Sequence, residues 1–196
     1  MSPHAPIIPD AEFAEFARAF ITEFHDDWDA LHAFETLHWT DGSLSVGLHA
    51  AIDTSYEPRD YPKIMLAMAS ETIDRCETEK MLPAPCGYLL QIETYYVETP
   101  DDANEAFKAQ LVQDHRDGSI STRPDTIEAA WAMVTDLRGN IWEAVKRRDT
   151  GEIREGFYPL HLPGGSQGRM VRALRTIGLT TGHRCWGMPD PTITLN

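Results

Sequence analysis

Apolar side chains recur every three or four positions near the start of the chain, which is the period of an amphipathic helix. This helix is predicted to begin at Asp10, whose carboxylate can cap it. Its aromatic and aliphatic stripe consists of Phe13, Phe16, Phe20, Phe24, Trp28 and Leu31. A stripe of this kind usually packs into a core, and docking in the groove of a partner is the alternative. Residues 1–9 contain three prolines and are expected to form an irregular arm.

Two runs of strand-forming residues lie on either side of Asp41 and Gly42. A short turn of this composition between such runs predicts a β-hairpin over residues 33–56. The apolar spacing then returns to the helical period, which predicts a second helix from about 60 to 80.

Residues 88–96 alternate strictly, so that every second side chain falls on the same side. This pattern predicts a strand with one buried and one exposed face. Thr99 followed by Pro100 is typical of a helix start, because proline at the first helical position loses no hydrogen bond. A third helix with a small apolar face is therefore predicted over 99–115.

The segment 127–160 carries three strand-like runs separated by turns at 137–140 and 149–151. These features predict a three-stranded antiparallel meander. A short final helix is expected from about 167 to 177. The order of elements favours an α+β fold, with an antiparallel sheet that includes this C-terminal meander and about four helices packed mainly on one face.

The chain has 196 residues, of which 42% are hydrophobic and 24% charged. This composition predicts a single domain over residues 10–196 with a core that needs no crosslinks. No apolar run reaches the length of a membrane span, and the N-terminus lacks the basic and apolar regions of a signal peptide. Cys76, Cys86 and Cys185 are too few and too dispersed to suggest a disulfide framework or a CxxC metal pair. We therefore expect a cytoplasmic protein that contacts no membrane.

The formal net charge is −14. This balance argues against nucleic-acid binding, which needs clustered cations. Residues 1–137 contain 26 acidic and 8 basic residues, whereas 138–196 contain 5 and 9. Either the two parts neutralise each other within one domain, or the cationic end faces an anionic ligand or partner.

Several short segments give the chain a recognisable pattern: GYLLQIETYYVE at 87–98, RPD at 123–125, DLRGNIW at 136–142 and KRRD at 146–149. Over about residues 86–158 this pattern resembles uncharacterised acidic proteins of actinobacteria and their phages. The resemblance implies a cytoplasmic or phage-encoded accessory role. It implies no activity and no site residues.

The stretch PGGSQGRMVRALR at 163–175 has the Gly-x-Ser-x-Gly spacing of a nucleophile elbow around Ser166. The chain continues for only 28 residues beyond Gly168, and within them His183 precedes Asp190, which is the reverse of the order in α/β-hydrolases. Pro163 also occupies the end of the required strand. A triad of other topology could still use His161, since triads are defined by geometry.

The same stretch can be interpreted as an anion cradle, because amide groups at a helix start and arginine side chains bind phosphate or carboxylate. The alternative is an ordinary helix cap with solvated or paired arginines and an inward-facing apolar side. The candidate anion-binding residues are Gly165, Ser166, Gln167, Gly168, Arg169 and Arg172.

A candidate metal site is formed by His25, Asp29 and His32, which have the spacing i, i+4 and i+7 of one helical face. Imidazole and carboxylate ligands suit Zn²⁺ or another transition metal. The aromatic stripe already defines the buried side of this helix, so the three residues are expected to face water. We expect no bound cofactor.

Two classes of function fit these observations. The favoured one is a non-enzymatic binding or accessory protein that engages a protein partner, a second copy of itself or a small anion. The alternative is a small hydrolase or transferase whose site lies near His161, Ser166, Arg169 and His183. An enzyme needs a pocket in which titratable groups converge, whereas a binding module needs an exposed patch.

Overall fold

Six antiparallel strands form one sheet in the order β2-β1-β3-β4-β5-β6. The computed structural model describes residues 4–23, 32–53, 55–56, 59–79, 84–100, 102–160 and 168–190. The elements are α1 (Asp10–Glu23), β1 (His32–Thr40), β2 (Ser43–Ile52), α2 (Tyr61–Glu79), β3 (Gly87–Tyr96), α3 (Glu105–Asp117), η1 (Ser119–Thr122), β4 (Ile127–Asp136), β5 (Ile141–Arg147), β6 (Ile153–Tyr158) and α4 (Arg169–Trp186). The predicted α+β class, with its antiparallel sheet and C-terminal meander, is confirmed.

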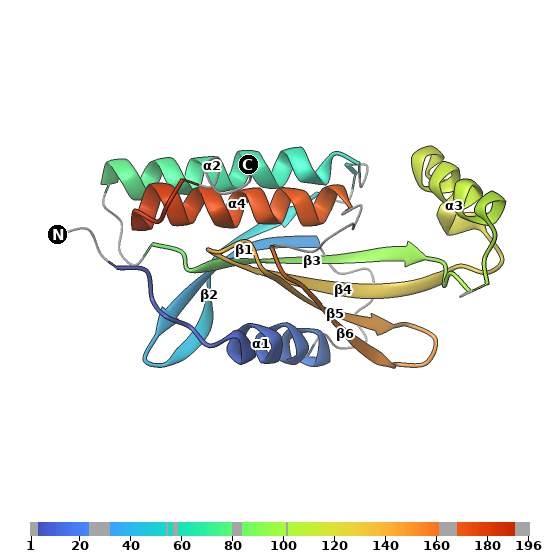
Figure 1. The fold of residues 1–196 in the computed structure, drawn as a ribbon, viewed down its shortest axis with the longest axis horizontal. Coiled ribbons are helices and arrows are strands. Elements are labelled where there is room, and N and C mark those ends of the chain that lie inside the picture. Colours follow the sequence, from blue (N-terminus) through green and yellow to red (C-terminus); the bar gives the residue numbers. More distant parts are fainter. Residues whose placement is uncertain are drawn as a thin grey trace.

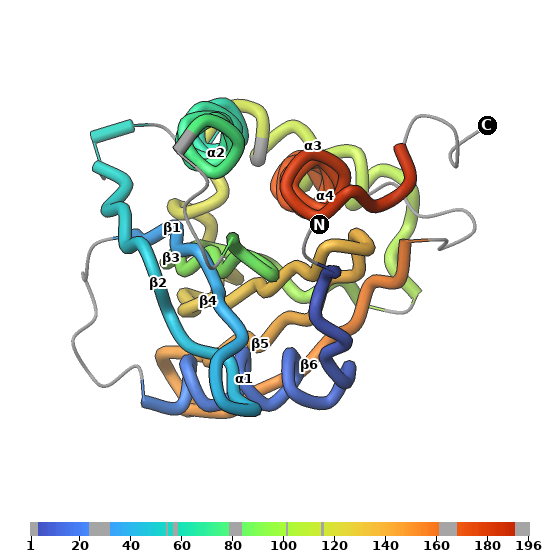
Figure 2. Tube along the Cα trace, turned by 90° about the vertical axis from the view of Figure 1, so that its left-hand side faces the viewer, coloured from blue at the N-terminus to red at the C-terminus, as the bar shows by residue number. Residues whose placement is uncertain are grey.

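The sheet lies between two helical layers of unequal size. Helices α2 and α4 run side by side over one face, and α1 lies against the other (Figures 1 and 2). Helix α3 stands apart, beyond the far ends of β3 and β4 (Figure 1), and packs against η1.

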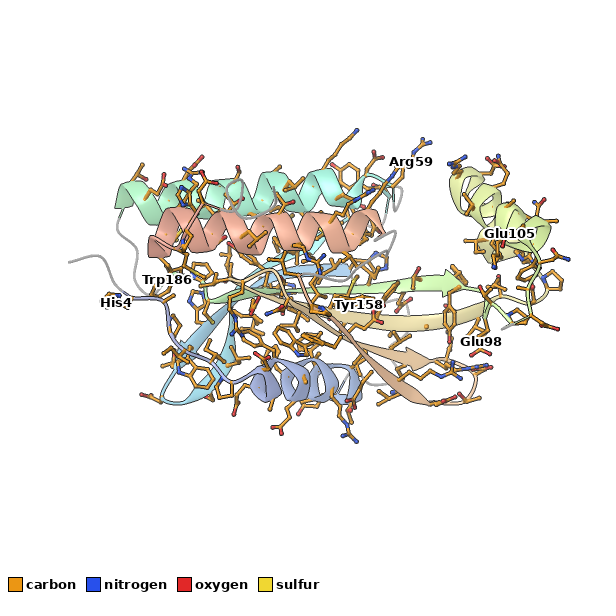
Figure 3. The ribbon with its side chains drawn as sticks, viewed as in Figure 1. His4, Arg59, Glu98, Glu105, Tyr158 and Trp186 are labelled. Carbon is orange, nitrogen blue, oxygen red and sulfur yellow. The ribbon has the colours of Figure 1, made fainter. Side chains whose placement is uncertain are left out.

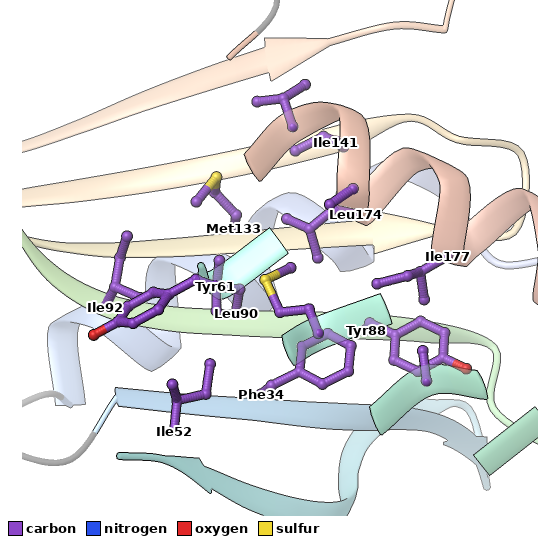
Figure 4. Packing of buried hydrophobic residues seen from close by; sticks show 14 residues of the cluster. Phe34, Ile52, Tyr61, Tyr88, Leu90, Ile92, Met133, Ile141, Leu174 and Ile177 are labelled. Atoms are coloured by element: carbon purple, nitrogen blue, oxygen red, sulfur yellow. The ribbon is translucent and has the colours of Figure 1, made fainter. Parts of the chain in front are cut away.

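The core beneath α2 and α4 combines side chains from both helices with every second residue of the central strands (Figure 4). The rings of Phe34 and Tyr88 stack with their centroids 5.4 Å apart. The Tyr88 hydroxyl also shares a 2.9 Å hydrogen bond with Thr181 Oγ1, which satisfies both buried groups. The members of this core that are at most 1% exposed include Met65, Leu90, Met133, Ile141, Leu174 and Ile177.

A second core forms where α1 meets the opposite face of the sheet. Phe13 of α1 stacks on Trp142 of β5, with ring centroids 4.8 Å apart. Ala17 and Ile21 are buried behind it. The predicted half-burial of β3 is therefore wrong for Gly87–Ile92, which is buried on both sides, because α1 covers the face that the alternation would leave exposed.

Helix α4 is longer than the predicted segment and ends at Trp186, where Gly187 takes a φ of 68°. Two glycines within the helix make this length compatible with close packing. A Cβ atom on Gly178 would lie 2.2 Å from the carbonyl oxygen of Asp136, and one on Gly182 would lie 2.9 Å from that of Leu137. Both positions need glycine because the helix backbone touches the β4–β5 turn.

Helix α3 begins later than predicted. Asn104 is its N-cap, and the Asn104 side chain accepts a 2.9 Å hydrogen bond from the amide of Phe107. Thr99 and Pro100 precede the helix, and the carbonyl of Pro100 accepts a hydrogen bond from the amide of Ala103. The side-chain amide of Asn104, five positions after the predicted start at Thr99, therefore sets where the helix begins.

Candidate binding surface

The predicted anion-binding loop is only partly within the described residues, since Gly165, Ser166 and Gln167 lie outside them. Gly168 is the N-cap of α4, and no side chain caps this end among the residues described. Arg169 and Arg172 are both exposed. Neither forms an ion pair within the described part of the chain. Anion binding at this helix start stays a prediction.

Arg175, the third arginine of the same stretch, is only 8% exposed and lies inside the fold. Its Nε donates to the carbonyl oxygen of Gly139 at 2.7 Å, and a terminal nitrogen donates to the carbonyls of Tyr158 and Pro159 at 3.0 Å each. Burial lowers the pKa of this guanidinium. Arg175 therefore joins α4 to the meander and presents no charge to a surface ligand.

The residues of the alternative hydrolase or transferase site do not converge where the structure describes them. Arg169 begins α4 and His183 lies in its last turn, which separates them by about 21 Å at 1.5 Å per residue. The ring of His183 shares a 3.0 Å hydrogen bond with the carbonyl of Met188. His161 and Ser166 lie outside the described residues.

Of the predicted metal ligands, His25 and Asp29 also lie outside the described residues. His32 begins strand β1, so it does not continue the helical face of α1 on which the prediction depended. Its Nδ1 lies 2.6 Å from the hydroxyl of Tyr61, and burial lowers its pKa. Within the described ranges, no three histidine, cysteine or acidic side chains group as metal ligands.

The half-buried carboxylate of Glu143 on β5 accepts hydrogen bonds from two side chains. Trp131 Nε1 donates to Glu143 Oε2 at 2.8 Å, and the Tyr158 hydroxyl donates to Oε1 at 2.6 Å. Burial raises the pKa of Glu143 and outweighs these two hydrogen bonds, which lower it. Both carboxylate oxygens accept hydrogen bonds from within the fold, which indicates a structural role for Glu143 and not a catalytic one.

A fully buried carboxylate, that of Glu35, lies on β1 next to the border strand β2. Glu35 on β1 is 5% exposed, and its Oε1 pairs with Nδ1 of His49 on β2. Glu35 Oε2 has no hydrogen-bond partner among the described residues. The pair fixes the ring of His49, which is the titratable side chain of β2, against the neighbouring strand.

The two borders of the sheet differ sharply in charge. Border strand β6 and the turn before it carry ion pairs from Arg154 to Glu152 and to Glu98, at 3.0 and 2.6 Å. Glu98 approaches this hairpin from the end of the sheet where α3 lies (Figure 3). Arg18 of α1 adds a further pair with Glu155 at 3.3 Å. Charged side chains on an edge strand oppose pairing with another chain.

The opposite border, β2, has the sequence SLSVGLHAAI and carries no aspartate, glutamate, lysine or arginine. Figure 2 shows β2 along one side of the sheet, and among the described residues β2 pairs with β1 alone. Val46 is 40% exposed and Leu48 is 53% exposed. A long border strand with exposed apolar side chains and no acidic, lysine or arginine side chain is a template for adding another strand.

A β-bulge lies at the centre of this border, where the register shifts between Glu35 and Leu37 of β1. The displaced amide of Leu48 donates to Thr36 Oγ1 at 2.7 Å, which keeps the bulge in place. A Cβ atom on Gly47 would lie 2.2 Å from the ring of His38, so the strand passes this ring too closely for a side chain. A bulge changes the direction in which neighbouring side chains point, and Leu48, which is exposed, lies at this bulge.

The surroundings of β2 are acidic. Both flanking helices, α1 and α2, contact the strand. Helix α1 carries four carboxylates and one arginine, and α2 carries four carboxylates, one lysine and one arginine. Asp41 lies two residues before β2, and Asp53 directly follows it. An uncharged strand bordered by negative charge favours a positively charged partner.

These features were partly readable from the sequence. The absence of aspartate, glutamate, lysine and arginine over 43–52 is visible there, whereas the position of this run at a border depends on the strand order.

None of the helices in the described ranges is long and apolar enough to cross a lipid bilayer. Comparisons with models of protein families, with curated proteins and with solved structures return no match. The function is therefore inferred from the chain's own geometry.

Proposed function

We propose that this chain is a non-enzymatic binding protein that accepts an extended, basic segment of a partner protein along β2. The observation that carries the proposal is the contrast between two borders of one sheet. β6 is lined with ion pairs, whereas β2 has exposed Val46 and Leu48 and no aspartate, glutamate, lysine or arginine.

Strand addition supplies affinity through the backbone and specificity through side chains. The amide and carbonyl groups on the outer side of β2 provide the backbone hydrogen bonds. Val46 and Leu48 provide apolar contacts on either side of Gly47, where the bulge divides the strand into two short runs. A segment that covers both exposed side chains must therefore extend across the bulge.

Charge selects the partner. Helices α1 and α2 flank the strand, and each carries more carboxylates than basic side chains. Asp10, Asp74 and Glu77 are already paired with arginines, so the remaining carboxylates are the ones that favour lysine or arginine side chains in an added segment. The same carboxylates repel another acidic chain, which disfavours a second copy of this protein as the occupant.

The alternative class, a small hydrolase or transferase, receives less support. Arg169 and His183 lie at opposite ends of α4. Glu143 has both oxygens bonded within the fold, and burial raises the pKa of the Cys86 thiol to about 12. These groups lack the convergence and the activation that catalysis requires.

The test uses a fluorescently labelled eight-residue peptide of alternating valine and lysine, with a valine–glutamate peptide as its charge control. We expect the lysine peptide to bind the full chain with a Kd below about 1 mM and more weakly at higher salt. The glutamate peptide should bind at least about tenfold more weakly, a difference of 1.4 kcal/mol.

Substitutions then locate the binding surface. Val46→Lys and Leu48→Lys should each weaken binding of the lysine peptide by about tenfold. Phe157→Lys is the matched control, since Phe157 is 47% exposed on the other border strand. The proposal is overturned if the lysine peptide fails to bind, or if Phe157→Lys weakens binding as much as the two β2 variants do.

A further inference from the structure

Two cysteines that are 109 positions apart in the chain meet where helices α2 and α4 end. The helices pack side by side and run in the same direction (Figures 1 and 2). Cys76 lies near the C-terminal end of α2, and Cys185 lies one residue before the end of α4. Parallel packing therefore brings both cysteines to the same end of the helical layer.

Ion pairs fix the register of the two helix ends. Arg184 Nε donates to Glu77 Oε1 at 2.9 Å, and a terminal nitrogen of Arg184 donates to Asp74 Oδ1 at 2.8 Å. These contacts join the residue next to Cys185 to residues on either side of Cys76. Trp186 Nε1 adds a 2.7 Å hydrogen bond to the carbonyl of Pro85, which anchors the end of α4 (Figure 3).

The two thiols are in contact within this frame. The thiol of Cys185 donates a hydrogen bond to the sulfur of Cys76, and both side chains are partly exposed. Burial raises the pKa of both thiols, and that of Cys185, which donates its proton to Cys76, rises to about 12. The hydrogen bond between the thiols lowers the pKa of Cys76 and raises that of Cys185, so Cys76 is the first of the two to form a thiolate.

We propose that Cys76 and Cys185 are a modification site at which a hydroperoxide forms one intramolecular disulfide that joins α2 to α4. The Cys76 thiolate attacks the peroxide, the O–O bond breaks, and a sulfenic acid forms while the leaving oxygen takes up a proton. Cys185 then attacks the sulfenic sulfur, the S–O bond breaks, and the hydroxyl leaves as water with the Cys185 proton. The two thiols together lose two electrons and two protons, and the hydroperoxide is reduced to an alcohol, or to water when it is hydrogen peroxide.

Cys86 provides an internal control. It is 2% exposed in the core beneath α1, and thus on the other side of the sheet from the paired thiols. Accessibility, and not pKa, distinguishes Cys86 from Cys76 and Cys185, because the partly exposed pair can be reached by a peroxide and Cys86 cannot.

Peptide mapping after treatment with hydrogen peroxide tests the pairing directly. Trypsin cleaves after Arg75 and Arg184, which places Cys76 in peptide 76–80, Cys185 in peptide 185–196 and Cys86 in peptide 81–108. Under non-reducing conditions we expect peptides 76–80 and 185–196 to be joined, with the loss of two hydrogen atoms. Dithiothreitol should separate them, and peptide 81–108 should keep a free thiol.

Cys76→Ser and Cys185→Ser should each abolish the joined peptide, whereas Cys86→Ser should retain it. Because the disulfide closes a loop of more than 100 residues, oxidation of the wild-type chain should raise its Tm by about 5 to 15 °C. Oxidation of Cys76 or Cys185 to sulfinic acid without a link would overturn the proposal. A disulfide that includes Cys86, or one that joins two chains, would do the same.

Discussion

Arg175 Nε lies 2.7 Å from the carbonyl oxygen of Gly139 and donates a hydrogen bond to it. Gly139 has a φ of 79° in the β4–β5 turn, and Arg175 is buried in α4. The same guanidinium donates to the carbonyls of Tyr158, the last residue of β6, and of Pro159, which follows it. A buried cation thus satisfies backbone acceptors from two separate segments and joins the last helix to the meander.

Replacing Arg175 should destabilise the fold strongly. Arg175→Ala leaves the buried carbonyl of Gly139 and the half-buried carbonyl of Tyr158 without the Arg175 donor and opens a cavity, which we expect to cost about 3 kcal/mol or more. The matched control is Arg172→Ala, one turn earlier on the exposed side of α4, which should change the free energy of unfolding by less than about 0.5 kcal/mol. Urea denaturation measures both. Equal effects would show that the buried hydrogen bonds contribute little.

Gly178 should not tolerate a methyl group. In Gly178→Ala the new Cβ atom would lie 2.2 Å from the Asp136 carbonyl oxygen, so α4 must move away from the β4–β5 turn. We expect a loss of at least about 2 kcal/mol, measured by thermal or urea unfolding. Gly168→Ala is the control, because none of the described residues outside its chain neighbours places an atom within 4 Å of the added methyl group, and it should cost less than about 1 kcal/mol. A larger loss at Gly168 than at Gly178 would contradict the close packing of α4.

Asn104, and not Thr99, should determine the stability of α3. Asn104→Ala removes the side chain that accepts from the Phe107 amide, which should destabilise the helix by about 1 kcal/mol. Amide hydrogen exchange in α3 is the suitable measurement, because this helix stands apart from the two cores and can open locally. Thr99→Ala should leave that exchange unchanged. Faster exchange in the Thr99 variant alone would contradict the N-cap at Asn104 and support a helix that starts at Thr99.

Glu143 should make stability depend on pH in a defined direction. Burial raises the pKa of its carboxyl in the folded state above the ordinary value of 4.5. Its protonated form therefore stabilises the fold fully below pH 4.5, and this contribution is lost as the pH rises through the raised folded-state pKa. Glu143→Gln resembles the protonated acid, so its free energy of unfolding should rise relative to wild type as the pH increases from 4 to 8.

Tyr158→Phe provides the companion measurement for Glu143. The Tyr158 hydroxyl donates to the carboxylate and lowers the Glu143 pKa, so its removal should move the pH-dependent loss of stability to higher pH. Urea denaturation curves at several pH values report both effects. A difference between Glu143→Gln and wild type that stays constant from pH 4 to 8 would contradict the raised pKa.

Local signals in the sequence predicted much of the fold. Turn residues located the hairpin at Asp41–Gly42 and the meander turn that contains Gly151, because positive φ angles select glycine. The predicted start of α3 was wrong because threonine followed by proline is also common in extended segments and turns. The double burial of β3 could not be predicted, because it depends on α1 crossing the second face of the sheet.

The candidate sites were less accessible to prediction than the fold. Arg175 belongs to a run of arginines in which nothing local distinguishes the buried member. The contact between Cys76 and Cys185 depends on parallel packing of two helices that are far apart in the chain. The uncharged run at β2 was visible, but its meaning depends on a border position that only the strand order gives.

Site-resolved hydrogen exchange of the β2 amides, with and without saturating valine–lysine peptide, tests the central claim most directly. In the free chain, the amides of Ser43–Ile52 that face away from β1 should exchange quickly. The peptide should slow these amides and leave those of β6 unchanged. Binding that slows exchange on β6 or α3 but leaves β2 unprotected would contradict the assignment of β2 as the partner-binding border.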